Sequence, residues 1–581
     1  MSHSLIVRQD LDFLLHDWLR LDEIADRATV DAVIDLSEKL ANDQFLTHYK
    51  QADVEEPTLT PEGVHICPPI REALKHYADL GLFSAGFSEE LGGLDLPYLA
   101  CAASFAYFAA ANLAASAYPM LTVANARLIA TFGTEAQVQH FAVPEIEGRW
   151  FGTMCLSEPQ AGSSLADVRT RAEPDGQDDL GARYRLVGNK MWISGGDQDV
   201  SENIVHLVLA KVAAANEALP EGTEGLSLFI VPKYLPDGTR NDIAIAGLNH
   251  KMGYRGTANC LLNFGETTGA IGWIVGQPGQ GLRQMFQMMN EARISVGLGA
   301  AAVGYRGYRL SVGYANERLQ GRPAGVRNGP QVPIIEHPDV KRMLLTQKAY
   351  VEGALALCLY SARLVDDEDN ADSANLLGLL TPITKTWPSE YGLVANDIAI
   401  QVHGGYGYTR DFDVEQLWRD NRLNPIHEGT TGIQAGDLLG RKILRDGTGM
   451  KVLEDRMNAT IDRAAAIEQL SGLGAALGTT WARVRDTAAK LGAGEAAHIF
   501  DNATPYLWAF GHVVVGWLWL DQAVLALQKN AASEAEAQFL TGKVRAARFF
   551  FECELPKVDS WLAVVSAAST VTAGAPLSTF Q

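Results

Sequence analysis

Cysteine is scarce in this sequence, and the six residues are scattered singly among 581. No Cys-X-X-Cys pair occurs, and no spacing of cysteine with histidine suits a zinc ion. A disulfide framework and a zinc centre are therefore not expected, and a reducing cytoplasm is the expected location. The segment before Leu14 contains Arg8, Asp10 and Asp12 and lacks the apolar run of a signal peptide. The mature chain is expected to begin at Met1.

Positive charge is also scarce, because 48 Lys and Arg face 69 Asp and Glu, giving a net charge of −21. This balance argues against a general surface for nucleic acid or anionic membrane, so a polyanionic substrate needs a local basic site. Two apolar stretches, residues 98–111 and 507–520, are shorter than the roughly 18–20 residues of a bilayer-spanning helix. They are expected to be buried core helices, with no membrane contact.

Common catalytic and nucleotide-binding signatures are missing. The sequence has no GXXXXGK[ST], no HEXXH and no GXSXG, which argues against P-loop, zinc-protease and serine-esterase chemistry. Gly297, Gly299 and Gly304 resemble part of a dinucleotide fingerprint but lie in a helical stretch, so they are expected to serve helix packing. No metal site is predicted.

Hydrophobic periodicity divides the chain into four regions, in line with roughly 150 residues per domain. Residues 1–151 have helical spacing and predict an N-terminal all-α domain. Residues 152–280 contain short strand-like runs separated by turn residues and predict a middle β-barrel or sandwich. Residues 281–445 predict a helical domain, and the Ala- and Leu-rich residues 446–581 predict an appended helical domain. The fold class is therefore α+β.

The third region should contain long helices, and the fourth a packed aromatic core. The expected helices run from Gly281 toward Leu319, onward from Pro338, and from about Pro388 to the turn at Gly404. The cluster Trp517-Leu-Trp519 in the appended region is expected to pack in a core rather than to touch a membrane.

Two segments near the junction of the first two regions could hold a flat ligand. MCLSEPQAGSS (residues 154–164) offers small residues, free N–H groups and hydroxyls, although a plain turn explains it equally well. KMWISGG (190–196) places the indole of Trp192 and the hydroxyl of Ser194 on the same face of a strand. An aromatic wall beside a hydrogen-bond donor suits a heterocycle such as a flavin.

Two further segments follow in the helical region: QVHGGYGYTR (401–410) and IHEGTTGIQ (426–434). Together with the two earlier segments, in this order, they resemble the acyl-CoA dehydrogenase flavoprotein family over about residues 14–442. The resemblance implies a helical N-terminal domain, a middle β domain and a C-terminal four-helix bundle, with FAD held between them and across a subunit boundary. A homo-oligomer is therefore expected, either a dimer or a tetramer.

The resemblance also implies which residues bind FAD. They are Met154, Leu156, Ser157, Gly162, Ser163, Trp192, Ser194, Arg318, Gln401, Gly404, Gly405, Thr430 and Gly432. Arg318, Gln401, Gly404 and Gly405 match contacts that come from a neighbouring subunit. The stretch after Arg318 lacks an aromatic residue that many members carry.

Glu428 matches the family's catalytic base, which removes the proton α to the thioester while hydride leaves the β-carbon for flavin N5. A carboxylate held close to a carbon acid and partly desolvated fits this task. In the family, the backbone N–H of the same glutamate helps to polarise the thioester carbonyl. Some members carry the base on the long helix instead. Ala292 stands at that position here, with Glu291 beside it, so Glu428 is the preferred base. Substrate contacts are implied for Ser163, Asn290 and Arg293.

The resemblance implies an FAD-dependent acyl-CoA dehydrogenase of fatty acid β-oxidation, which forms a trans-2-enoyl-CoA and passes electrons to an electron-transfer flavoprotein. The alternatives are an acyl-CoA oxidase that uses oxygen, and a non-catalytic CoA-binding or scaffold protein. Residues 446–581 resemble the extension of long bacterial members such as 3-methylmercaptopropionyl-CoA dehydrogenases and fatty acyl-CoA dehydrogenases. This extension could cover the dimer, replace a second dimer, or dock a partner. The acyl chain is not fixed by the sequence.

Overall fold

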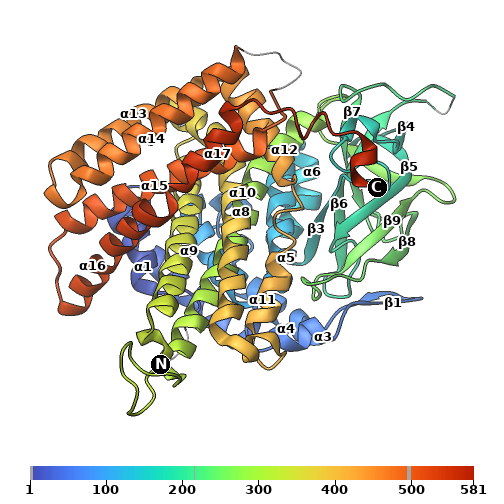
Figure 1. The fold of residues 1–581 in the computed structure, drawn as a ribbon. Coiled ribbons are helices and arrows are strands. Elements are labelled where there is room, and N and C mark those ends of the chain that lie inside the picture. Colours follow the sequence, from blue (N-terminus) through green and yellow to red (C-terminus); the bar gives the residue numbers. More distant parts are fainter. Residues whose placement is uncertain (1–3, 215, 494–498) are drawn as a thin grey trace. The chain divides into compact units, whose positions relative to one another are not determined.

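The computed structural model describes residues 4–214, 216–493 and 499–581, and the chain divides into two units (Figure 1). Unit 1 comprises Met1–Ile24 with Arg293–Gln581, and unit 2 comprises Ala25–Ala292. The division falls within the long helix α8 (Gly281–Glu317). The expected α+β class is confirmed, because unit 2 combines helices with a sheet and unit 1 is built almost entirely of helices.

The helices of unit 2 include one that is very long and apolar. They are α2 (Arg27–Leu40), α3 (Tyr49–Val54), α4 (Pro68–Asp79), α5 (Tyr98–Phe132), α6 (Glu135–Gln137) and α7 (Val143–Ile146). With 35 residues, α5 is long and apolar enough to cross a membrane, so the expectation of a short stretch is wrong. Its most apolar window is nevertheless 89% buried, which confirms a core helix.

The all-α expectation for residues 1–151 misses a β-hairpin. Strands β1 (Thr58–Thr60) and β2 (Gly63–His65) pair antiparallel, with Thr60 opposite Gly63. The turn uses Pro61 and places Gly63 at φ +138°, a conformation that glycine adopts without strain. Three residues per strand are too few for an alternating pattern to stand out in the sequence.

The strands of unit 2 form an eight-stranded sheet that closes on itself. They are β3 (Trp150–Cys155), β4 (Arg171–Asp178), β5 (Gly181–Ser194), β6 (Asn203–Val212), β7 (Leu226–Pro232), β8 (Ile243–Leu248), β9 (Asn259–Phe264) and β10 (Ala270–Ile274). The order is β10-β7-β6-β4-β5-β9-β8, and β10 also pairs with β5. Of the two architectures expected, the ring of pairings therefore gives the barrel. Strand β3 joins the sheet parallel to β6.

Unit 1 is helical, and glycines set the spacing of its helices. Outside the appended region it contains α1 (Arg8–Asp12), most of α8, α9 (Pro338–Val365), α10 (Ala371–His403), α11 (Val414–Asn421) and α12 (Thr431–Gly436). A Cβ at Gly297 would lie 2.0 Å from the carbonyl oxygen of Thr384 on α10, and one at Gly304 would lie 3.0 Å from Cα of Gly392. The helix-packing interpretation is confirmed for Gly297 and Gly304, and for Gly299 it stays a prediction.

The expected start of the third helix at Pro388 is wrong. Helix α10 begins at Ala371, and the side chain of Asn370 caps it by accepting from the N–H of Asp372. Pro382 and Pro388 both lie inside the helix. Proline is favoured at helix starts and breaks isolated helices, but close packing on several sides keeps α10 continuous here.

The described residues of the appended region include five α-helices. They are α13 (Thr448–Ala465), α14 (Glu468–Gly492), α15 (Ala503–Gln528), α16 (Glu534–Phe549) and α17 (Lys557–Ser566), coloured orange to red in Figure 1. They pack on α9 and α10 of the same unit. Trp517 and Trp519 on α15 are 3% and 0% exposed, so the expected core packing is confirmed. Helix α15 is also long and apolar enough to cross a membrane, but 83% of its most apolar window is buried.

Candidate active site

The first predicted flavin segment lies at the end of β3 in unit 2 and is tied to β5. The carbonyl of Leu156 accepts from Nζ of Lys190 at 2.9 Å, and that of Ser157 accepts from the N–H of Met191 at 2.9 Å. Further along the segment, Gly162 and Ser163 are exposed. The structure therefore brings the 154–163 and 190–194 segments together, as one ligand-binding surface requires.

A buried ion pair beneath this segment was missed by sequence reasoning. Nζ of Lys190 lies 2.9 Å from Oε1 of Glu158, and the two side chains are 0% and 3% exposed. Glu158 also accepts from the N–H groups of Arg169 at 2.7 Å and Thr170 at 3.0 Å. Burial acts to raise the pKa of Glu158, but Lys190, the hydroxyl of Thr170 and the N–H of Arg169 hold it below its ordinary value. The pair fixes the segment that precedes Gly162.

Trp192 stands out from β5 in a strained backbone conformation. Its φ is +67°, its side chain is 57% exposed, and the ladder with β9 shifts register between Lys190 and Ile193. Such a bulge re-aims a side chain, and left-handed φ in a bulky residue is typical of functional positions. Nearby, Oγ of Ser194 accepts from Nδ2 of Asn259 at 3.3 Å. An open indole face beside hydroxyl and amide groups fits the flat, polar-edged ring of a flavin.

In unit 1, the loop before α12 carries Glu428 at φ +53°, followed by Gly429 at φ +93°. The loop is held by its backbone. Nε2 of Gln434 donates to the carbonyl of Glu428 at 2.9 Å, and Nζ of Lys385 donates to that of Gly429 at 2.7 Å. Among the described residues, neither the carboxylate nor the N–H of Glu428 has a hydrogen-bond partner. Both groups are therefore available to a ligand.

The electrostatics of this loop favour a base. Burial raises the pKa of Glu428 above its ordinary value, while Arg293 and Lys385 act to lower it. Burial lowers the pKa of Lys385 to about 8, although Glu428 acts to raise it. Burial and the nearby Lys385 lower the pKa of His427 to about 3, so this imidazole is neutral near pH 7. The carboxylate is the only one of these groups that can accept a proton as an anion.

The predicted substrate residues on α8 differ in their surroundings. Arg293 is 4% exposed, and its Nη1 lies 3.1 Å from Oδ2 of Asp437, whose other oxygen accepts from Nε of Arg441 at 2.6 Å. A CoA phosphate would have to compete with this carboxylate for the guanidinium. Asn290, in unit 2, is half-buried. Its contact with substrate stays a prediction.

The alternative base, Glu291, is already engaged within unit 2. One of its carboxylate oxygens lies 3.1 Å from Nη1 of Arg127, and its carbonyl accepts from the hydroxyl of Tyr98 at 3.4 Å. A carboxylate paired with a guanidinium is a weaker base than an unpaired one. The structure therefore favours Glu428 over Glu291.

The residues expected to reach a neighbouring subunit lie exposed in unit 1. Arg318, Gln401, Gly404 and Gly405 are all open to solvent, and the guanidinium of Arg318 lies over the ring of Tyr406 at 5.9 Å. Gly404 has φ +59° and ends α10. Thr430, the residue before α12, is exposed as well, and a Cβ at Gly432 would meet no heavy atom within 4 Å.

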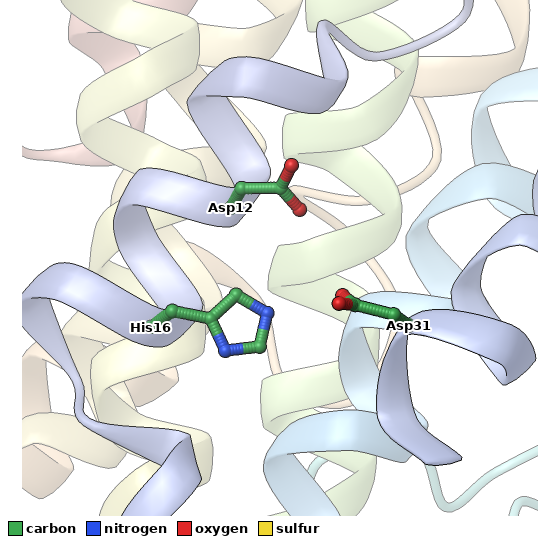
Figure 2. A group of neighbouring side chains, drawn as sticks. All are labelled: Asp12, His16 and Asp31. Atoms are coloured by element: carbon green, nitrogen blue, oxygen red, sulfur yellow. The ribbon is translucent and has the colours of Figure 1, made fainter. Parts of the chain in front are cut away.

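Figure 2 draws three potential metal ligands: Asp12 and His16 on the N-terminal segment and Asp31 on α2. Asp12 and His16 belong to unit 1, whereas Asp31 belongs to unit 2, so the three are not assigned as one site. Asp12 pairs with Arg8 at 2.6 Å. His16 contacts Asp22 on the same segment.

In a comparison with known proteins, a family model matches part of each of the four regions of the chain. Family models match for the acyl-CoA dehydrogenase N-terminal domain (residues 34–149), middle domain (153–267) and C-terminal domain (279–443). A model described as acetyl-CoA dehydrogenase C-terminal like matches residues 453–576.

Relatives match over most of their length. The 3-methylmercaptopropionyl-CoA dehydrogenase of Ruegeria pomeroyi is 36% identical over 84% of this chain and 83% of its own. The broad-specificity linear acyl-CoA dehydrogenase FadE5 of Mycobacterium tuberculosis is 33% identical over 91% and 90%. A structure of an acyl-CoA dehydrogenase from Bacillus anthracis complexed with FAD shares the fold, with a TM-score of 0.75 at 18% identity over 97% and 91%. The chain belongs to the acyl-CoA dehydrogenase family.

Proposed function

We propose that this protein is an FAD-dependent acyl-CoA dehydrogenase that converts an acyl-CoA into its trans-2-enoyl-CoA, with Glu428 as the base. The observation that carries the proposal is the state of Glu428. Gln434 donates to its carbonyl and Lys385 to the carbonyl of the next residue, Gly429, while the carboxylate and N–H of Glu428 have no partner among the described residues. The carboxylate can accept the α-proton, and the N–H can donate to the thioester carbonyl as charge develops there.

For the residues of unit 2, we propose a role in binding and orienting the cofactor. FAD, when bound, accepts the two electrons and the hydrogen that leave the β-carbon. Trp192 offers a ring face to the cofactor, Ser194 a hydroxyl at its edge, and the exposed backbone around Gly162 a close approach. The raised pKa of Glu428 brings its basicity nearer to that needed for a carbon acid, which favours proton transfer.

The proposal also covers the electron acceptor, the oligomeric state and the cellular location of the protein. Electron-transfer flavoprotein is the proposed acceptor, in keeping with the dehydrogenases among the relatives. A homo-oligomer is proposed because four residues that match contacts to the FAD of a neighbouring subunit are exposed and so free to reach it. They are Arg318, Gln401, Gly404 and Gly405. The cytoplasm is proposed as the location, supported by six cysteines that are all free thiols.

The test is an anaerobic titration of the purified protein with short, medium, long, branched and thioether acyl-CoAs, followed by flavin absorbance. Bleaching by one class supports the proposal and identifies the substrate. A colourless protein that takes up no FAD would favour a scaffold, and rapid turnover in air with peroxide and no other acceptor would favour an oxidase.

Glu428→Gln keeps the size of the side chain and removes the base. We expect this variant to retain its flavin, but reduction of the flavin by acyl-CoA should be roughly 10³- to 10⁴-fold slower than in the wild type. Glu291→Gln serves as the comparison and should stay within a few-fold of the wild type, because Glu291 is paired with Arg127. The reverse pattern would transfer the role of base to Glu291.

A further inference from the structure

One carboxylate on α10 links the appended domain to the loop that carries Glu428. Oε1 of Glu390 accepts from Oγ1 of Thr431 at 2.6 Å, and Oε2 accepts from Nε1 of Trp508 at 2.7 Å. Thr431 is the first residue of α12, and Trp508 lies on α15 of the appended domain. Each carboxylate oxygen of Glu390 therefore accepts one hydrogen bond, one from α12 and the other from the appended domain. Hydrogen bonds to an ionised acceptor are stronger than those between neutral groups.

The same helix also holds the loop two residues earlier. Lys385, one and a half turns before Glu390 on α10, donates to the carbonyl of Gly429 at 2.7 Å. Glu428, one residue before the first of these anchors, has φ +53°, which is a strained conformation for a residue other than glycine. A strained backbone persists only where its surroundings hold it in place. The anchor at Thr431 therefore adds to the bonds from Gln434 and Lys385 that hold this loop in place.

The appended domain contacts this region at a second place. The ring of Phe500 lies against the segment that continues α12, where a Cβ at Gly440 would come within 2.7 Å of Cε1. The ring of Trp508 lies beside that of Trp561 on α17, at 6.0 Å between ring centroids, a contact between rings that a phenylalanine at 561 would keep. The domain thus presents Phe500 to the segment that follows α12, and Trp508 to Glu390 on α10.

We propose that the appended domain positions the catalytic base, through the hydrogen-bonded chain from Trp508 to Glu390 to Thr431. Trp508 is a positioning residue that never meets the substrate: it holds Glu390, which holds the start of α12 and so the preceding loop. The catalytic part of this inference rests on the proposed function of Glu428. The mechanical part, that Trp508 orders residues 426–434, does not.

The mechanical part is tested by hydrogen–deuterium exchange on the FAD-loaded protein. Trp508→Phe keeps an aromatic ring and removes the N–H, and Trp561→Phe is the matched control in the same domain. We expect amides of residues 428–434 to exchange faster in Trp508→Phe and at the wild-type rate in Trp561→Phe. Unchanged exchange in Trp508→Phe would overturn the proposal whatever reaction the protein performs.

The catalytic part is tested by the rate of flavin reduction at saturating acyl-CoA, counted per bound flavin. Trp508→Phe should slow reduction about tenfold with little change in the half-saturating substrate concentration, because misplacement of a reacting group costs rate rather than binding. Trp561→Phe should remain within about twofold of the wild type. Equal losses in both variants would indicate general weakening of the domain and refute a positioning role.

A double-mutant cycle with Thr431→Val identifies the route. Valine keeps the shape of threonine and removes the hydroxyl that Glu390 accepts from. If both residues act through Glu390, the double variant should reduce flavin no more slowly than the worse single variant. Fully additive losses would show that Trp508 acts by another path. A different outcome would separate the two parts of the inference. If no acyl-CoA reduces the flavin of the wild type, but amides of residues 428–434 exchange faster in Trp508→Phe, the mechanical link stands and the proposed function is refuted.

Discussion

Replacing Lys385 by methionine should move the acid limb of the pH–rate profile, where the rate falls as the pH is lowered, toward neutral pH. Lys385 is 0% exposed on α10, and its ammonium group acts on Glu428 to lower the pKa of that carboxyl. Glu428 must be ionised to accept a proton, so the rate falls as pH drops through its pKa, which burial already holds above 4.5. Without the cation this pKa rises further, and the midpoint of the acid limb should move up by about one pH unit.

The size of the change in stability follows from the same side chain. Burial lowers the pKa of Lys385 from 10.5 to about 8, so the folded state disfavours its charge. Over about 2.5 units this costs about 3 kcal/mol at pH values well below 8. Methionine removes that cost but leaves the carbonyl of Gly429 without its charged donor, a loss of about 1.5–3 kcal/mol. The free energy of unfolding should therefore change by no more than about 2 kcal/mol.

The assay is stopped-flow flavin reduction between about pH 5 and 9, with bound flavin and thermal midpoint measured on each sample. Lys442→Met is the matched control, because its half-buried ammonium group is not among the charges acting on Glu428. An acid limb that stays in place in Lys385→Met, or moves to lower pH, would refute the reasoning. A limb that moves equally in Lys442→Met would show a general effect of lost positive charge.

Two further predictions concern packing. Lys190→Met leaves Glu158 buried without its cation and should lower the free energy of unfolding by about 3–5 kcal/mol and weaken FAD retention, as measured by denaturant unfolding and flavin content. Wild-type stability and flavin content would contradict this account of the pair. Gly297→Ala puts a Cβ 2.0 Å from the carbonyl oxygen of Thr384 and should cost about 1–3 kcal/mol by the same measurement. Gly472→Ala, with no atom within 4 Å of its Cβ, should be neutral or stabilising by up to about 1 kcal/mol, and equal losses in both would contradict the packing argument.

The sequence by itself determined the fold class and the family. Periodicity changes with secondary structure, so a chain whose spacing passes from helical to strand-like and back reveals its order of elements. The helix-packing role of Gly297 was also accessible, because three glycines in one helical stretch are costly unless another backbone approaches closely. Local signals failed where they conflict with tertiary packing. The pattern around Pro388 predicts a helix start although this proline lies inside α10, and the strands of the hairpin at residues 58–65 are too short to give an alternating pattern.

The candidate site was only partly accessible in this way. Glu428 and Trp192 could be named because they stand in motifs with characteristic neighbours. Their positive φ values, however, are properties of the folded backbone that the surrounding contacts impose.

Only the tertiary structure decided which residues support the site. Lys385 is 44 positions from the carbonyl of Gly429 that it contacts, and Trp508 is 118 positions from Glu390. A lysine in a helix or a tryptophan in an apolar run has the same local pattern whether or not it meets a catalytic loop. Contacts between distant positions arise when helices pack side by side, and packing depends on the shapes of all the side chains together. The sequence therefore names the base, and the fold identifies what holds it.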